Sequence, residues 1–192
     1  MRMKTQVRVL GIDDSPFRFS EGRSLVVGAV VRLPNYLEAV MRTEVEVDGD
    51  DATDRLAEMI SRSRYRDQVK VVMLDGIALA GFNVVDVQAL HEAVGIPVLT
   101  VTRDSPDLEG MRGALKKHFP DWERRYELIT RLDLRRIPTE HSPLHASGVG
   151  LGWDEFVRLV EQSTVRGAVP EPLRMAHIIA AAMVKGESKG RP

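Results

Sequence analysis

Two aspartates in distant parts of the chain stand where residue type and position could support chemistry. The segment from Val7 ends on Asp13, and the apolar run from Val71 ends on Asp75, which Gly76 follows at once. Apolar runs of this kind are typical of strands buried on both faces of a sheet. We therefore expect each carboxylate at the tip of a rigid strand, with simple turn formation as the alternative role for either one alone.

If the two strands are neighbours, Asp13 and Asp75 repel each other unless a cation lies between them. Hard oxygen ligands at a partly hydrated site suit Mg²⁺, with Mn²⁺ as the other candidate. A third carboxylate is available at the start of the next predicted helix, from Asp51 or from its neighbours Asp48 and Asp50. Asp50 and Asp51 are also competent caps for that helix, and the sequence leaves both roles open.

His177, on the last predicted helix, is a further candidate for a metal ligand or a proton carrier. A single histidine on a helix is more commonly an ordinary polar residue at the edge of the packed face, so both roles stay open. His141 and His145 are four residues apart, but a proline interrupts the stretch, so the spacing does not place them on one helical face as a zinc pair. The glycines from Gly148 to Gly152 lack the lysine of a phosphate-binding loop and indicate an ordinary turn.

The segment Val69 to Arg103 positions Asp75. Its pattern predicts a strand, a helix over Val84 to Val94, and a second strand from Ile96 that leads into Arg103. A strand, a helix and a strand in this order fit a right-handed parallel crossover, in which ligands meet the carboxyl ends of the strands. We therefore expect Asp75 and Arg103 side by side at that edge.

Three more strands are predicted upstream, and they form an antiparallel meander: Val7–Asp13, Ser24–Arg32 and Leu37–Val47. A helix with Leu56, Met59 and Ile60 on its apolar stripe leads into the crossover. The order β-β-β-α-β-α-β is the plan of the ribonuclease H-like fold. We therefore predict an α/β protein with a mixed five-stranded sheet, order 3-2-1-4-5, flanked by helices, in a single domain over residues 1–186 with a polar tail at 187–192.

Composition excludes several classes of protein. The 192 residues contain no cysteine, so there is no disulfide framework, thiolate nucleophile or cysteine-based zinc site. Because no stretch approaches a membrane span or a signal peptide, we expect a soluble, cytoplasmic protein with no membrane partner. The net charge of −1 gives no global basic field of the kind that many nucleic-acid-binding proteins carry. Short basic clusters are more typical of solvated helix ends and loops: Arg62–Arg66, Lys116–Lys117, Arg124–Arg125 and Arg135–Arg136.

Several motifs together resemble a known family. The stretch VVMLDGIALAGFNVVDVQALHEAVGIPVLTVTR, from Val71, is similar to the endonuclease V pattern of a strand ending in Asp-Gly, a loop and helix, and a Gly-Ile-Pro strand ending in a basic residue. Gly11-Ile12-Asp13 resembles the first catalytic strand of that family, and PEPLRMAH, from Pro170 to His177, resembles its C-terminal signature. With GIDDSPF and VDGDDAT included, the chain is identified as a member of the archaeal endonuclease dU family, related to endonuclease V.

The resemblance implies a Mg²⁺-dependent endonuclease that hydrolyses a phosphodiester in damaged DNA. Asp13 and Asp75 match the metal-binding aspartates, and Asp51 falls where endonuclease V has a glutamate at the start of a helix. His177 matches the C-terminal metal-site position. Arg103 stands where endonuclease V has a lysine near the scissile phosphate, where a cation neutralises developing charge.

The chain also departs from endonuclease V. Gly81 and Asn83 occupy the loop in which that family has a histidine and an arginine, and its Pro-Tyr wedge is not recognisable near Thr43 to Asp50. We therefore expect a deaminated base other than hypoxanthine, such as uracil in DNA, and RNA stays open as a substrate. The second hypothesis is a nucleic-acid or nucleotide binding module that kept the fold and lost catalysis.

Overall fold

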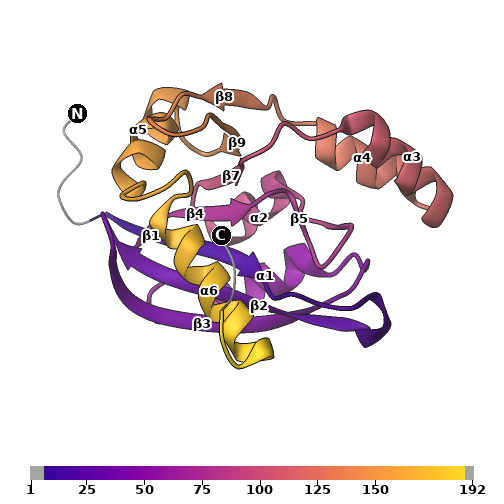
Figure 1. Ribbon diagram of the computed structural model, residues 1–192, viewed down its shortest axis with the longest axis horizontal. Helices are drawn as coiled ribbons and strands as arrows, with labels where there is room; N and C mark the ends of the chain where they lie inside the picture. Colours follow the sequence, from indigo (N-terminus) through magenta and orange to yellow (C-terminus); the bar gives the residue numbers. More distant parts are fainter. Residues whose placement is uncertain (1–6, 189–192) are drawn as a thin grey trace.

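The computed structural model describes residues 7–188 and is built around one seven-stranded sheet in the order β3-β2-β1-β4-β7-β9-β8 (Figure 1). Strand β1 is antiparallel to β2 and parallel to β4, which is in turn parallel to β7. The bounds of the sheet strands are β1 Arg8–Asp14, β2 Arg23–Arg32, β3 Tyr36–Glu46, β4 Val69–Asp75, β7 Val98–Thr102, β8 Arg135–Ile137 and β9 Leu144–Val149. A separate two-stranded ribbon pairs β5, Ala78–Leu79, with β6, Asn83–Val84.

Helices cover both faces of the sheet. Their bounds are α1 Ala52–Ser61, α2 Val87–Val94, α3 Leu108–His118, α4 Trp122–Thr130, α5 Trp153–Ser163 and α6 Glu171–Lys185, with a 3₁₀ turn at Phe19–Glu21. Helices α1 and α2 pack on one face and α5 and α6 on the other. The hairpin of α3 and α4 projects from one end of the sheet (Figure 1). No helix within residues 7–188 is long and apolar enough to cross a membrane.

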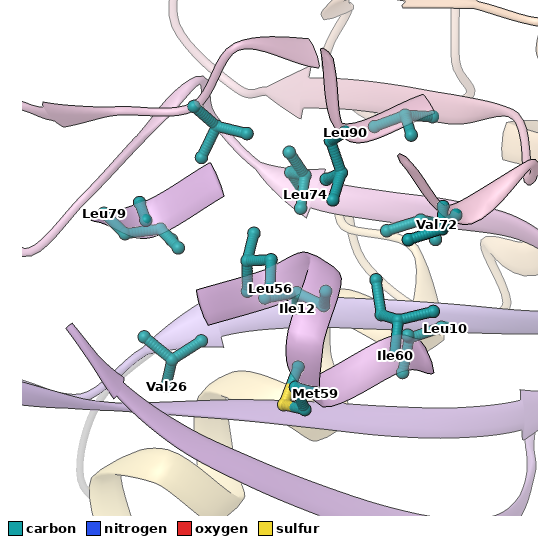
Figure 2. Close-up of a cluster of buried hydrophobic side chains, with 14 of the residues drawn as sticks. Leu10, Ile12, Val26, Leu56, Met59, Ile60, Val72, Leu74, Leu79 and Leu90 are labelled. Atoms are coloured by element: carbon teal, nitrogen blue, oxygen red, sulfur yellow. The ribbon is translucent and has the colours of Figure 1, made fainter. Parts of the chain in front are cut away.

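Alternating side chains of the central strands feed two separate apolar layers. On β1, Leu10 and Ile12 pack against α1, whereas Val9 packs on the opposite side against α5 and α6. Figure 2 shows the first layer, in which Leu56 and Ile60 of α1 meet these strand residues. Because both faces are covered, the central strands are continuous apolar runs, which is why the sequence shows them clearly.

The predicted five-stranded sheet is too small. Strands β9 and β8 extend it beyond β7, and both are antiparallel to their neighbours. Neither strand belongs to the predicted five, and β8 has only three residues, of which Arg135 and Arg136 are exposed. A strand this short with polar side chains leaves no periodic signal. The predicted tail at 187–192 lies mostly outside the described residues.

Candidate active site

The register of β1 and β4 brings Asp13 and Asp75 to the same edge of the sheet. Ile12 lies opposite Leu74 in this parallel pair, so the aspartate that follows each of them occupies the next position on its strand. Side chains alternate along a strand. Asp13 therefore lies on the same face of the sheet as Gly11, and Asp75 lies on the same face as Met73. Because Gly11 pairs with Met73, both carboxylates lie on one face.

Burial raises the pKa of both carboxylates. Burial, and then the charge of Asp75, raise the pKa of Asp13 from 3.8 to about 8. The pKa of Asp75 is also raised by burial, although Arg103 and His177 lower it in part. Only 6% of Asp13 is exposed. The two residues follow paired positions on neighbouring parallel strands, and the charge of Asp75 contributes to the raised pKa of Asp13.

Asp14 is a third acid at this edge, half-buried, and it was not among the residues selected from the sequence. Its Oδ2 accepts a hydrogen bond from the backbone N–H of Ala80 at 3.0 Å. Burial raises its pKa to about 6, and Asp75 contributes to this shift while the bond from Ala80 opposes it. The signal available in the sequence was its position next to Asp13 at the end of a strand.

Helix α6 brings His177 to Asp13. The ring Nδ1 of His177 lies 2.8 Å from Asp13 Oδ2. A Cβ atom on Gly11 would lie only 2.2 Å from the backbone carbonyl carbon and oxygen of Pro172, so the start of α6 rests directly on β1. From Pro172 the helix rises about 7.5 Å to His177, while β1 advances about 6.8 Å from Gly11 to Asp13. The glycine and the helix start therefore set the position of the histidine.

Asp51 does not join this group. Its Oδ1 accepts hydrogen bonds from the N–H of Glu46 and the side-chain amide of Asn83. Its Oδ2 faces Arg55 and Arg23 in ion pairs of 3.4 and 3.7 Å. Burial raises its pKa, but these hydrogen bonds and Arg55 outweigh burial and lower it overall. The structure therefore gives Asp51 the role of fixing the turn between β3 and α1.

The side chains of Asp48 and Asp50 likewise contact other residues. Asp48 Oδ1 accepts the N–H of Phe82 at 2.8 Å, and Asp50 faces Arg124 at 3.5 Å. Asp51 itself is the residue before α1, but no side-chain bond to that helix end forms. The predicted third carboxylate at the start of α1 is thus a contact point between loops, not part of the edge at Asp13.

Arg103 follows β7 directly and belongs to the same edge as Asp75. Its guanidinium is close enough to lower the pKa of Asp75, and the residue is exposed. The expected neighbourhood of these two side chains is therefore present. Of the two histidines considered as a zinc pair, His145 lies on β9 and His141 in the preceding loop.

A cavity of about 570 Å³ adjoins this edge, beside the residue that follows Asp75. Its sides are mainly apolar, and the hydroxyl groups of Thr100 and Ser147, 2.8 Å apart, lie at the sheet. The residues that line it are Gly76, Ile77, Ala78, Gly81, Thr100, Thr102, Pro106, Leu108, Met111, Ile129, Thr130, Leu132, Asp133, Leu134 and Ser147. Apolar cavities with a few polar groups are typical of small-ligand sites.

The donor set suits a hard divalent cation. Within residues 7–188, no three acidic, histidine or cysteine side chains form a group that could hold a metal ion by themselves. Mg²⁺, however, is commonly held by one or two carboxylates, with water and substrate phosphates as its other ligands. Asp13 and Asp75 supply two such carboxylates, and burial raises the pKa of each, with the charge of Asp75 adding to the shift of Asp13.

The mixed α/β fold of this chain, a multistranded sheet covered by helices, is similar to that of endonuclease V. Human endonuclease V matches with a TM-score of 0.60 and 17% identity over 95% of this chain and 86% of that one. The Ciona intestinalis enzyme, solved with DNA containing an inosine followed by a ribo-adenosine, matches with a TM-score of 0.63 and 12% identity over 96% and 88%. The chain itself belongs to the endonuclease dU family, whose profile matches residues 5–184.

Relatives span nearly the whole chain. A UPF0215 protein of Methanothermobacter thermautotrophicus is 45% identical over 98% of this chain and 93% of its own length. A UPF0215 protein of Thermococcus gammatolerans is 40% identical over 97% of both chains. The crystal structure of a protein of unknown function from Archaeoglobus fulgidus matches with a TM-score of 0.84 and 36% identity, over 93% of this chain and 98% of that one.

Proposed function

We propose that the protein is a metal-dependent endonuclease that hydrolyses a phosphodiester in deaminated DNA, with deoxyuridine as the base lesion. The observation that carries the proposal is the pair of carboxylates at the tips of neighbouring parallel strands, buried Asp13 and half-buried Asp75, whose pKa values are both raised by burial. Membership of the endonuclease dU family and the fold shared with endonuclease V support it. We also assign the sheet to the ribonuclease H-like class, and residues 1–186 to one domain.

In this proposal Asp13 and Asp75 hold Mg²⁺, or Mn²⁺ in its place. When bound, such an ion stabilises negative charge on phosphoryl oxygens and lowers the pKa of a bound water. His177 holds Asp13 in place and exchanges a proton at its Nδ1, and Arg103 binds the phosphate. We also propose that the protein is cytoplasmic, as expected from its sequence.

The cavity next to Gly76 supports recognition of a base that has left the helical stack. Enzymes that act on a damaged base commonly move it into a pocket, where it is read by stacking and hydrogen bonds. The hydroxyl groups of Thr100 and Ser147 supply donors and acceptors there. The position of the cavity also supports base recognition, because Gly76 lines the cavity and directly follows Asp75.

A labelled-substrate panel tests the proposal. Uracil, hypoxanthine and xanthine are compared in single- and double-stranded DNA and in RNA, with Mg²⁺, with Mn²⁺ and with chelator. We expect metal-dependent cleavage of the uracil substrate, abolished in Asp75→Asn and retained in Asp67→Asn, a matched change on an exposed acid. Absence of cleavage with either ion on every substrate would refute the proposal.

A binding module without catalysis is the second candidate. It is favoured by the hydrogen bond that already ties Asp13 to His177 and by the lack of a three-ligand group within residues 7–188. Binding to the damaged strands without cleavage, unchanged by chelator, would support this alternative.

A further inference from the structure

The cavity beside Gly76 has two walls that come from different parts of the chain. One wall is the loop that carries the β5–β6 ribbon, including Ala78 and Gly81. The opposite wall is the α3–α4 hairpin, including Met111 of α3 and Ile129 of α4. The size of any group that enters the cavity therefore depends on how far this hairpin stands from the ribbon.

Arg125 of α4 joins the two walls. Its Nη1 donates hydrogen bonds to the backbone carbonyls of Phe82 and Gly49, each at 2.6 Å. Phe82 follows the wall residue Gly81, and Ile129 lies one helical turn beyond Arg125 on α4. The guanidinium thus links a residue next to one wall with the helix that forms the other.

The environment of Arg125 is unusual for an arginine. Only 7% of the residue is exposed, and its guanidinium lies 4.4 Å from the centre of the Phe119 ring. Its Nε donates to Asp121 Oδ1 at 2.9 Å. That ion pair spans one turn of the same helix and needs no burial, so it does not explain why the side chain reaches across to the ribbon. A buried charge destabilises the folded state unless hydrogen bonds and ion pairs offset its desolvation. One role of such a charge is to fix a single arrangement of the neighbouring elements.

We propose that Arg125 is a positioning residue that sets the separation of the ribbon and the α3–α4 hairpin, and so the size of the base that the cavity accepts. This inference rests on the proposed function, since it assumes that a base enters the cavity. Arg125 does not line the cavity, and its hydrogen bonds go to Asp121, Gly49 and Phe82. Lysine cannot replace it, because a single ammonium does not reproduce the planar fork of a guanidinium.

The test measures kcat and KM for matched uracil and hypoxanthine substrates in the full-length protein. Arg125→Met keeps the length of the side chain and removes its donors, and Arg125→Lys keeps only its charge. Arg124→Met is the matched control, because Arg124 is the exposed neighbour and also pairs with Asp121. We expect Arg125→Met to shift the ratio of kcat/KM values about tenfold toward the larger base, mainly through KM. The ratio should stay unchanged in Arg124→Met and shift by an intermediate factor in Arg125→Lys.

Hydrogen exchange provides a second readout that needs no cleavage. Amide exchange should accelerate in residues 76–84 and 122–130 of Arg125→Met while the central strands remain protected, whereas a general loss of stability would accelerate exchange everywhere. An unchanged ratio in a folded Arg125→Met, or failure of both Arg125 variants to fold, would overturn the inference alone. A wild-type protein that cleaves no modified substrate would instead refute the proposed function, and the base-size inference with it.

Discussion

Asp13 and Asp51 both lie at the ends of secondary-structure elements, yet their surroundings shift their pKa values in opposite directions. Asp51 accepts two hydrogen bonds on one oxygen and faces two arginines with the other, and its pKa is lowered. Asp13 is buried beside another acid, and its pKa is raised to about 8. Its compensating contacts are a histidine nitrogen and its neighbour's backbone amide.

This difference separates a structural acid from a candidate catalytic acid. The charge of Asp51 is already stabilised by hydrogen bonds and ion pairs within the chain, so it needs no bound cation. A buried carboxylate beside a second one is stabilised by a bound cation, and acids with strongly shifted pKa values concentrate at functional sites. Position at the end of an element therefore identified both candidates, and only their surroundings distinguish them.

The largest expected effect is on cleavage. Asp13→Asn removes one charge of the pair without changing its shape, and we expect cleavage of the uracil substrate to fall about 10³-fold, as for loss of a group that stabilises transition-state charge. Asp51→Asn should leave the rate per folded molecule within about threefold, since no reacting group is lost. Single-turnover rates at matched folded fractions provide the measurement. Equal losses in both variants would remove the distinction between the two acids.

The second effect is on the pH dependence of stability without divalent cations. Because the pKa of Asp13 is about 8 in the folded protein against an ordinary 3.8, the folded state keeps this proton more tightly, and the free energy of unfolding falls as the pH rises from about 4 to about 8. At 1.36 kcal/mol per pKa unit, the full loss is on the order of 5 kcal/mol. Urea unfolding at pH 5 and pH 8 in chelator measures the larger part of this loss in wild type, and Asp13→Asn should not show it.

Asp51 provides the opposite sign in the same experiment. Its lowered pKa adds stability above its ordinary value of 3.8, and this stability is lost only as the pH falls below that value. Asp51→Asn should therefore keep the loss of stability between pH 5 and pH 8. Addition of Mg²⁺ should restore stability at pH 8 in wild type and not in Asp13→Asn. A pH profile unaltered in Asp13→Asn would show that this carboxyl is not strongly perturbed.

The third effect comes from the glycine that seats α6 on β1. Gly11→Ala places a Cβ 2.2 Å from the backbone of Pro172, which has no flexible side chain to give way. We expect a loss of about 2–3 kcal/mol in the free energy of unfolding, from overpacking, together with reduced cleavage as His177 moves from Asp13. Gly113→Ala on α3 meets nothing within 4 Å and is the control, expected to be neutral or stabilising by about 0.5–1 kcal/mol.

Much of this arrangement could be predicted from the sequence, because the central strands are buried on both faces and end in acids. The tips at Asp13 and Asp75, the crossover that places Arg103 beside Asp75, and the helix that carries His177 all follow from apolar runs and their order. The two-residue strands β5 and β6 and the three-residue polar strand β8 could not be predicted. Strands this short do not show an alternating pattern of apolar and polar residues.

The buried polar contacts were harder to predict than the strands. Asn83 stands between apolar residues and is fully buried, where its side chain bonds the turn before α1. Arg125 lies on the same helical stripe as Trp122 and Leu128, which placed it on the inner face of α4. Both signals were present in the spacing. The acceptor that each side chain reaches lies on a segment distant in sequence, however, and only the folded chain brings it within range.

The smallest expected effect is the change in the free energy of unfolding when Asp51 is replaced. Asp51→Ala removes the acceptor of the Glu46 N–H and one of the two acceptors of the Asn83 amide, and we expect a loss of about 1–2 kcal/mol in the free energy of unfolding. The loss should be the same with Mg²⁺ and with chelator, because this carboxylate binds no ion. Asp107→Ala, which removes an exposed cap from α3, is the control, with an expected loss of about 0.5–1 kcal/mol. A Mg²⁺-dependent loss in Asp51→Ala would return Asp51 to the metal site, and its bonds to Arg55 and Asn83 would then have to break when the ion binds.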